Sequence, residues 1–112
     1  MPRTADALGL KTKLFRGLSD PNRLAILEAL RGGPKNVSQV VSLTGLTQPN
    51  ASTHLNCLWC CGIVDREARG RFTVYRIKSK KIVRILEAAA DVLADVADRI
   101  AECARYDAKE DA

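Results

Sequence analysis

The fold is decided by residues 36–62, which read NVSQVVSLTGLTQPNASTHLNCLWCCG. Asn36 can cap a short helix, because its side chain accepts hydrogen bonds from the free backbone N–H groups of the first turn. Gly45 can end that helix, since glycine readily takes the left-handed conformation of a helix terminus. Thr47 can cap a second helix directly afterwards, and Pro49 is tolerated in its first turn. Two helices joined by so short a link predict a helix-turn-helix corner.

Two more helices are expected upstream of this corner. Apolar residues at helical spacing predict the first of them, and these are Leu8, Leu14, Phe15 and Leu18. The segment 19–21 then ends one helix and begins the next, with Asp20 as its cap and Pro21 at the first helical position. That second helix ends before residues 31–34, whose two glycines and proline cannot continue it.

After Gly62 the apolar periodicity changes to one typical of strands. Residues 63–68 and the β-rich run 72–77 flank a turn at Arg69-Gly70. We therefore expect a two-stranded hairpin, which would be the wing of a winged helix-turn-helix. The resulting fold class is mainly α with a small β-hairpin.

From Lys80 onward, apolar residues alternate in steps of four and three, which is the spacing of a coiled-coil seam. The seam consists of Ile82, Leu86, Ala89, Leu93, Val96, Ile100 and Cys103. It spans about 31 Å at 1.5 Å per residue, more than so small a domain is expected to cover by itself. A second copy of the chain is therefore the expected cover, although packing wholly within its own chain is the alternative.

The size and charge of the chain limit the classes of function. Its 112 residues predict a single domain over 1–112 that carries every site. The formal net charge is +5, and because residues 107–112 are acidic, the positive excess belongs to the body of the chain. That favours a polyanionic partner such as DNA, although a basic composition alone also occurs in ordinary soluble proteins.

No segment has the length and hydropathy of a signal peptide or a transmembrane span, so a cytoplasmic location is expected. The four cysteines of the chain are Cys57, Cys60, Cys61 and Cys103. In a reducing compartment they are more often metal ligands, redox groups or core fillers than disulfides.

Polar side chains gather at the start of the second helix of the corner, and they are Gln48, Asn50, Ser52, Thr53 and His54. An α-helix fits the major groove, where such side chains read the donor and acceptor pattern of the base pairs. Since their apolar neighbours must face the core, Gln48, Ser52 and His54 are the expected contacts to base edges. The alternative is that they are ordinary helix-start residues. A metal-binding role for His54 is disfavoured, because positions 50 and 58 offer no thiol or carboxylate.

Three arginines, Arg66, Arg69 and Arg71, flank the expected hairpin turn. A guanidinium at such a tip can reach phosphates or a narrow minor groove. Charged residues at hairpin tips are also commonly just solvated, so solvation without any DNA contact is the alternative for these three arginines.

Cys57 and Cys61 stand four residues apart, so their Cβ atoms lie about 5 to 6 Å apart on a helix and both thiolates can reach one ion. Cys60, three residues after Cys57, is a weaker candidate by the same rule. Soft thiolates favour thiophilic ions such as Cd²⁺, Pb²⁺, Hg²⁺, Zn²⁺ and Cu⁺ over Mg²⁺, Mn²⁺ or Ni²⁺. Burial as core residues is the alternative for Cys61 and Cys103.

The sequence resembles the ArsR/SmtB family of bacterial metal-responsive repressors along nearly its whole length. Three segments carry the match: residues 18–27 read LSDPNRLAIL, residues 46–55 read LTQPNASTHL, and GIV at 62–64 leads to YRI at 75–77. The resemblance implies a winged helix-turn-helix repressor that binds operator DNA and is a homodimer through its N- and C-terminal helices.

Within that family, LNCLWCCG at residues 55–62 looks most like the cadmium and lead sensors of the CmtR type. This resemblance implies Cd²⁺ or Pb²⁺ as the effector, with Hg²⁺ or Zn²⁺ as alternatives. It also implies a third thiolate from near the C-terminus of the other subunit, for which Cys103 is the only candidate. Cys60 is an additional thiol that departs from the subtype's pattern.

These features predict a repressor that binds operator DNA as a metal-free homodimer and is released when a thiophilic ion binds its thiolates. A thiol-redox switch that uses Cys60 and Cys61 is the main alternative, although a helix C-terminus does not favour thiolate. A DNA-binding protein with no effector is a third reading. An enzyme is disfavoured, because there is no phosphate-cradling glycine loop, catalytic triad or plausible carboxylate pair.

Overall fold

The computed structural model describes residues 4–106, so the acidic stretch 107–112 lies outside the described residues. Five α-helices and three strands follow one another along the chain, with a short 3-10 helix after the last. Their bounds are α1 Thr4–Ser19, α2 Pro21–Leu30, β1 Lys35–Asn36, α3 Val37–Thr44, α4 Gln48–Cys60, β2 Val64–Arg69, β3 Phe72–Ile77, α5 Lys80–Glu102 and η1 Ala104–Tyr106.

The predicted helix caps are confirmed. The Asp20 carboxylate accepts hydrogen bonds from the backbone N–H groups of Asn22 and Arg23, at 2.9 and 3.1 Å. Asn36 caps α3 in a reciprocal capping box, and Thr47 caps α4. These side chains satisfy N–H groups that have no partner inside the helix, which fixes where each helix begins.

The sheet has three strands in the order β1-β3-β2, and both pairings are antiparallel. The prediction of a two-stranded hairpin is therefore incomplete. The missing strand β1 pairs Lys35 with Tyr75 and Asn36 with Val74. A strand of two residues has no periodicity of its own, because only its pairing with a distant strand defines it.

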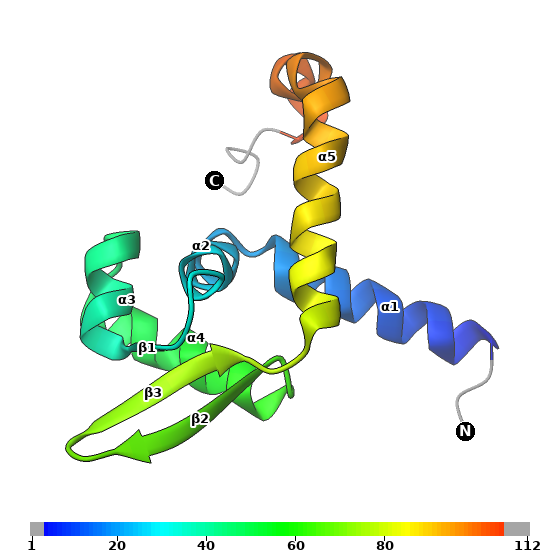
Figure 1. Ribbon diagram of the computed structural model, residues 1–112. Helices are drawn as coiled ribbons and strands as arrows, with labels where there is room; N and C mark the ends of the chain where they lie inside the picture. Colours follow the sequence, from blue (N-terminus) through cyan, green and yellow to red (C-terminus); the bar gives the residue numbers. More distant parts are fainter. Residues whose placement is uncertain (1–3, 107–112) are drawn as a thin grey trace.

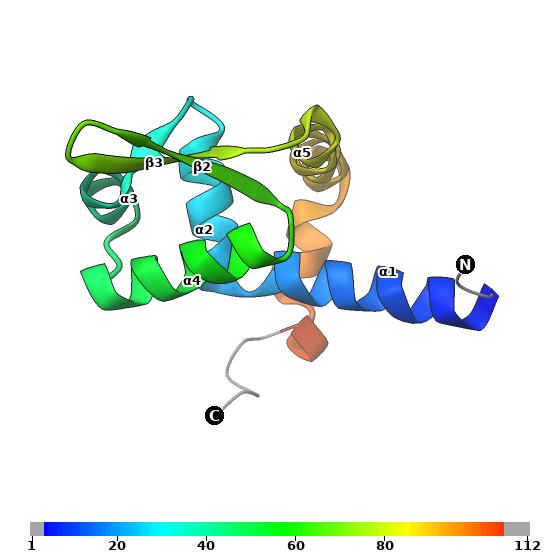
Figure 2. The same ribbon diagram turned by 90° about the horizontal axis from the view of Figure 1, so that it is seen from below.

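The core joins the three helices α2, α3 and α4 to the sheet. Its largest fully buried side chains are Ile26, Leu27, Val40, Leu55 and Val64. The stripe predicted for α4 is confirmed, because Ala51, Leu55 and Leu58 are all buried. This packing holds one side of α4 against the body and leaves its other side at the periphery (Figure 2).

The helices α1 and α5 project away from this body in different directions (Figure 1). The expected seam on α5 is buried only at its start, at Ile82 and Leu86, whereas Leu93 and Ile100 are 46% and 39% exposed. Wholly internal packing of α5 is therefore excluded for the part of the chain described. Within that part, no helix is both long and apolar enough to cross a membrane.

Candidate DNA interface and thiol site

The first half of α4 presents polar side chains outward. Gln48, Asn50 and Thr53 are exposed and Ser52 is half-buried, while the buried stripe faces the other way. Thr47 Oγ1 accepts a hydrogen bond from the backbone N–H of Asn50 at 3.3 Å, so the cap fixes the start of this face. Four of the five predicted DNA-contacting residues are thus at least partly exposed, and two of them, Gln48 and Ser52, are predicted contacts to base edges.

His54 lies differently from these four. It is half-buried, and its Nε2 atom is 3.4 Å from Nδ2 of Asn22 on α2. Its ring therefore bridges α4 to α2, a contact that the sequence pattern did not indicate. Base contact by His54 stays a prediction, and any such contact has to be made from a ring that already has a protein neighbour.

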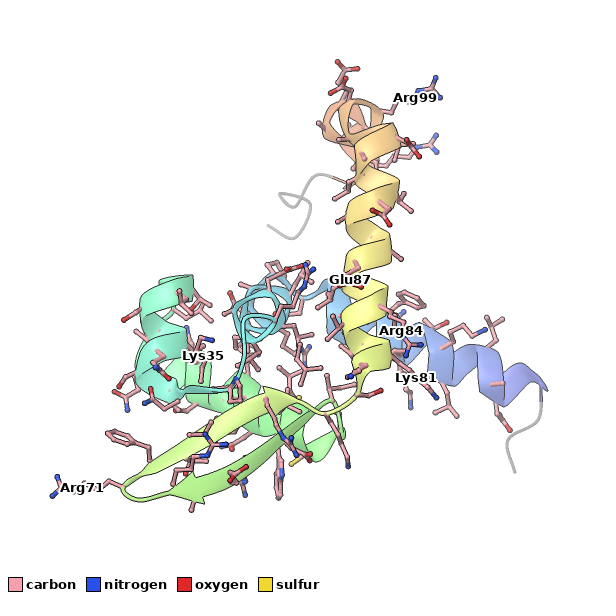
Figure 3. All side chains as sticks on the ribbon, viewed as in Figure 1. Lys35, Arg71, Lys81, Arg84, Glu87 and Arg99 are labelled. Carbon is pink, nitrogen blue, oxygen red and sulfur yellow. The ribbon has the colours of Figure 1, made fainter. Side chains whose placement is uncertain are left out.

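The three wing arginines have different surroundings. Arg69 pairs with Glu67 at 3.4 Å, and both side chains are exposed. Arg71 extends outward from the hairpin tip (Figure 3), and the described residues give it no hydrogen bond or ion pair. Among the three wing arginines, Arg71 is therefore the one to which the described residues provide no partner.

Arg66 is not at the tip but at the base of the wing, against the end of α4. Its guanidinium lies 3.6 Å from the ring centroid of Trp59 and donates a hydrogen bond to Oδ1 of Asn56 at 3.1 Å. A guanidinium over an indole face is an attractive cation–π contact. We call these three residues the wing clasp. Sequence reasoning missed Asn56 and Trp59. The only signal in the sequence was a tryptophan near the end of a helix that is followed closely by an arginine-containing strand.

Two thiols meet at the last turns of α4. Cys57 is half-buried, and Cys61, the C-cap residue, is exposed on one side and lines a pocket on the other. Burial raises the pKa of the Cys61 thiol above its ordinary value, and the adjacent Cys57 thiol raises it further. The predicted convergence of this pair therefore agrees with the structure.

Arg23 of α2 completes the surroundings of the pair. Its Nη1 atom donates a hydrogen bond to Sγ of Cys57 at 3.1 Å, and its Nη2 atom lies 3.8 Å from Oδ2 of Asp20. The Nε atom of Arg23 is buried and has no hydrogen-bond partner. Sequence reasoning treated this arginine only as part of a family motif, yet it links the thiols to the cap of α2.

A pocket of about 360 Å³ opens beside these thiols, between α1 and the end of α4. Cys57, Cys61 and Arg23 lie on one side of it. The remaining walls are largely apolar, with one further cation, and they are formed by Leu10, Lys13, Leu14, Gly17, Leu18, Leu58 and Ile63. The pair of thiols therefore opens into an apolar space and not onto a polar surface.

The other two thiols lie elsewhere. Cys60 is exposed and does not line the pocket, and Cys103 is the C-cap of α5, at the far end of that helix (Figure 1). Among residues 4–106, no group of three or more His, Cys, Asp or Glu side chains is placed to hold a metal ion. One chain thus offers two neighbouring soft donors, so an ion that takes three or more ligands would need a further donor from elsewhere.

Comparison with known proteins places these features in context. The sequence pattern described as bacterial regulatory protein, arsR family, matches residues 20–66. A probable mercury resistance operon repressor of Streptomyces lividans is 31% identical over 93 residues, which cover 83% of this chain and 74% of the relative. The HTH-type transcriptional regulator CmtR of Mycobacterium tuberculosis is 39% identical over 74 residues, which cover 66% of this chain and 63% of CmtR.

A solved structure is also similar along most of the chain. It is the homodimeric winged helix-turn-helix DNA-binding domain of a possible ArsR-family transcriptional regulator from Mycobacterium bovis. Its sequence identity is 30%, the TM-score is 0.70, and the match covers 86% of this chain and 88% of that domain.

Proposed function

Because the chain belongs to the ArsR/SmtB family of DNA-binding transcriptional repressors, and is not an enzyme, we propose that a thiophilic metal ion bound at Cys57 and Cys61 releases it from operator DNA. The observation that carries this proposal is the contact between Arg23 and Cys57, which joins the thiol pair to the helix-turn-helix body. By analogy with the CmtR type, cadmium or lead is the preferred ion, with mercury or zinc as alternatives.

The DNA-binding part of the proposal uses the outer face of α4 and the wing. Gln48, Ser52 and His54 are the proposed contacts to base edges, and the exposed Asn50 and Thr53 are proposed to contact DNA beside them. Arg71 at the wing tip is the proposed phosphate contact, with Arg69 nearby and Arg66 held at the base of the wing. Because these contacts rest on exposed polar and cationic groups, the affinity should fall as salt is raised.

The homodimer is proposed from the uncovered apolar side chains of the two projecting helices. Leu8, Leu10 and Phe15 on α1 are 66%, 54% and 53% exposed, and Val92 and Leu93 on α5 are 56% and 46% exposed. Apolar surface of this extent is typical of a protein interface. Two copies joined through α1 and α5 would present two α4 helices to one face of DNA, where successive major grooves recur at about 34 Å.

The thiols fit a soft ion by their chemistry, because thiolate sulfur favours such ions. Cys57 and Cys61 of one chain would hold such an ion, together with a third donor, for which we propose Cys103 of the other chain. Cys60 is exposed beside the pair, and its place in the site is secondary.

The proposed switch depends on the hydrogen bond between Arg23 and Cys57. In this proposal Cys57 exchanges its hydrogen bond from Arg23 for a bond to the ion. Arg23 then keeps only its contact with Asp20, the cap of α2, and α2 also holds His54 through Asn22. A rearrangement at the thiols therefore changes contacts that orient α4, and the effector acts only through the difference in its affinity for the two arrangements.

The test begins with an operator fragment selected from random duplexes by binding to the metal-free, reduced protein. At fixed salt, Cd²⁺, Pb²⁺, Hg²⁺ and Zn²⁺ are added separately while DNA anisotropy and the thiolate-to-metal ultraviolet band are recorded. We expect release to follow the ultraviolet band, to be lost in Cys57→Ser and Cys61→Ser, and to persist in Cys60→Ser.

Metal binding without release would refute the switch, and release by peroxide but not by metal would identify a redox sensor instead. Cys103→Ser tests the third donor separately, because it should weaken metal binding without affecting binding of the metal-free protein to DNA.

A further inference from the structure

We propose that Arg66 binds a phosphate of the DNA backbone beside α4, and that Trp59 and Asn56 are positioning residues that hold its guanidinium ready for that contact. The proposal rests on the DNA binding proposed above and deepens it, because it gives the wing clasp a role in that binding. Three observations carry it: the contacts that hold the guanidinium, the separation of Arg66 from the nearby carboxylates, and its place along one side of α4.

The wing clasp holds the guanidinium of Arg66 without using most of its hydrogen-bonding capacity. The guanidinium carbon lies 3.6 Å from the ring centroid of Trp59, and Nη1 donates to Oδ1 of Asn56 at 3.1 Å. A guanidinium has five N–H donors, and this is the hydrogen bond that residues 4–106 provide for it. Because Arg66 is exposed, its remaining N–H groups are open to an acceptor on another molecule. Phosphate oxygens suit such a planar fork of donors.

Alternation along β2 separates Arg66 from its acidic neighbours in the sequence. Asp65 and Glu67 flank it, but successive side chains of a strand point to opposite faces of the sheet. On their face, Asp65 lies 3.4 Å from Arg76, and Glu67 lies 3.4 Å from Arg69. Arg66 lies on the face turned to α4, and no ion pair joins it to a carboxylate among residues 4–106. Its charge is therefore held in place but not compensated within this part of the chain.

The clasp continues a line of side chains that begins among the proposed DNA contacts. Gln48, Ser52 and Asn56 follow one another in steps of four, and residues at this spacing are neighbours on one side of a helix. A helix that lies in the major groove is bordered by the phosphates of the DNA backbone. Arg66, which is hydrogen-bonded to Asn56, therefore carries this line of side chains toward the backbone at the edge of the groove.

Holding the side chain in advance raises the affinity for DNA without adding a contact. Immobilising a long, flexible side chain at an interface lowers affinity by about 2- to 12-fold. Arg66 is already held by the clasp, so this loss is smaller when it meets a phosphate. Removal of the Trp59 ring should therefore weaken DNA binding while the number of phosphates neutralised, and with it the dependence on salt, stays the same.

The first experiment measures the affinity of the reduced, metal-free protein for the operator fragment and for an unrelated duplex at several salt concentrations. Arg66→Ala should weaken binding to both duplexes by the same factor and reduce the salt slope by about 1. Arg76→Ala is the matched control, because it removes the same charge from the opposite face of the wing and should leave the slope unchanged. An unchanged slope in Arg66→Ala, or an equal reduction in Arg76→Ala, would overturn the phosphate contact.

The second experiment separates positioning from contact. Trp59→Leu keeps an apolar side chain without the ring, so it should weaken binding to both duplexes by about 2- to 12-fold and keep the salt slope of the wild type. Trp59→Phe keeps an aromatic face for the guanidinium and should restore most of the affinity. Asn56→Ala should act in the same direction as Trp59→Leu. Wild-type affinity in Trp59→Leu, or a loss that Trp59→Phe does not restore, would overturn the positioning role.

Fluorescence reports the clasp without DNA, because Trp59 is the single tryptophan of the chain. Quenching by acrylamide should increase in Arg66→Ala, where the ring loses its cover, and stay the same in Arg76→Ala. Equal quenching in the wild type and Arg66→Ala would contradict the stacked arrangement. Binding of the wild type to the operator and its release by Cd²⁺ are measured in the same series, so failure of the proposed function is seen independently of these variants.

Discussion

The two halves of α4 share one helix and one buried stripe, yet their outer surfaces differ in how they are held. In the first half, Gln48 and Thr53 are exposed and the described residues provide no side-chain hydrogen bond to either. In the second half, Cys57 accepts a hydrogen bond from Arg23, and the ring of Trp59 makes a cation–π contact with Arg66. The half that is free suits contact with another molecule, and the half that is tied to α2 and β2 suits control of where the helix lies.

The largest expected effect comes from disrupting the buried apolar stripe, which runs along both halves of α4. Leu55 is fully buried in the middle of the stripe, so Leu55→Ala should lower the free energy of unfolding by about 2 to 5 kcal/mol. Chemical denaturation measures this loss. Leu43→Ala is the control, because Leu43 is 60% exposed and should change stability by no more than about 0.5 kcal/mol. Equal losses would contradict the placement of the core.

Substitutions in the free half should affect DNA and leave stability unchanged. Gln48→Ala should weaken operator binding by about 1 to 3 kcal/mol and relax the preference at one base pair. Arg71→Ala should instead weaken binding to all sequences alike and reduce the salt slope by about 1. Anisotropy titrations at several salt concentrations separate the two, and a uniform effect of Gln48→Ala would remove it from the base-reading set.

The tied half can be loosened through Asp20, which caps α2 and contacts Arg23. The backbone N–H of Arg23 is the main cause that lowers the pKa of Asp20, and partial burial opposes it. A carboxylate with a lowered folded pKa adds stability above its ordinary pKa and loses it as the pH falls through the folded value. Asp20→Ala should therefore cost about 1 kcal/mol at neutral pH and much less in acid.

Denaturation curves from pH 7 down to pH 3 check this sign. Asp20→Asn, which keeps a capping side chain without its charge, should remain near the wild type at neutral pH. A cost of Asp20→Ala that grew on acidification would contradict the assigned role of the carboxylate.

The smallest expected effect concerns the wing clasp of Asn56, Trp59 and Arg66. Trp59→Ala removes the cation–π contact and should cost about 0.5 to 1 kcal/mol at this exposed site. Amide hydrogen exchange should increase in β2 more than in α3. Arg66→Lys tests geometry against charge, because lysine keeps the charge but not the planar stacking. Unchanged exchange in both variants would show that the clasp does not hold the wing.

The sequence predicted those parts of the fold that depend on local signals. Asp20, Asn36, Thr47 and Gly45 mark helix ends by their own side chains or backbone freedom, and the structure confirms them. The strand β1 was missed, because two residues carry no pattern and only their pairing with Tyr75 and Val74 defines the strand. Local signals thus predict where helices begin and end, whereas contacts between distant segments become evident only in the structure.

The site divides in the same way. The spacing of Cys57 and Cys61 predicted two thiols on one side of a helix, which agrees with their shared pocket. The contact of Arg23 with Cys57 joins residues 34 positions apart, so no spacing rule indicates it. The same holds for Arg66, which was expected near the hairpin tip but reaches back to Trp59.

The most direct test of coupling between the two halves is the affinity of the reduced protein for Cd²⁺, measured from the thiolate-to-metal band with and without saturating operator DNA. Coupling is reciprocal, so DNA must weaken metal binding by the same factor by which metal weakens DNA binding, about 5- to 150-fold for typical couplings. We expect the two factors to be equal in the wild type, and we expect operator DNA to leave metal binding unchanged in Cys57→Ser. A metal affinity that is the same with and without operator would contradict it.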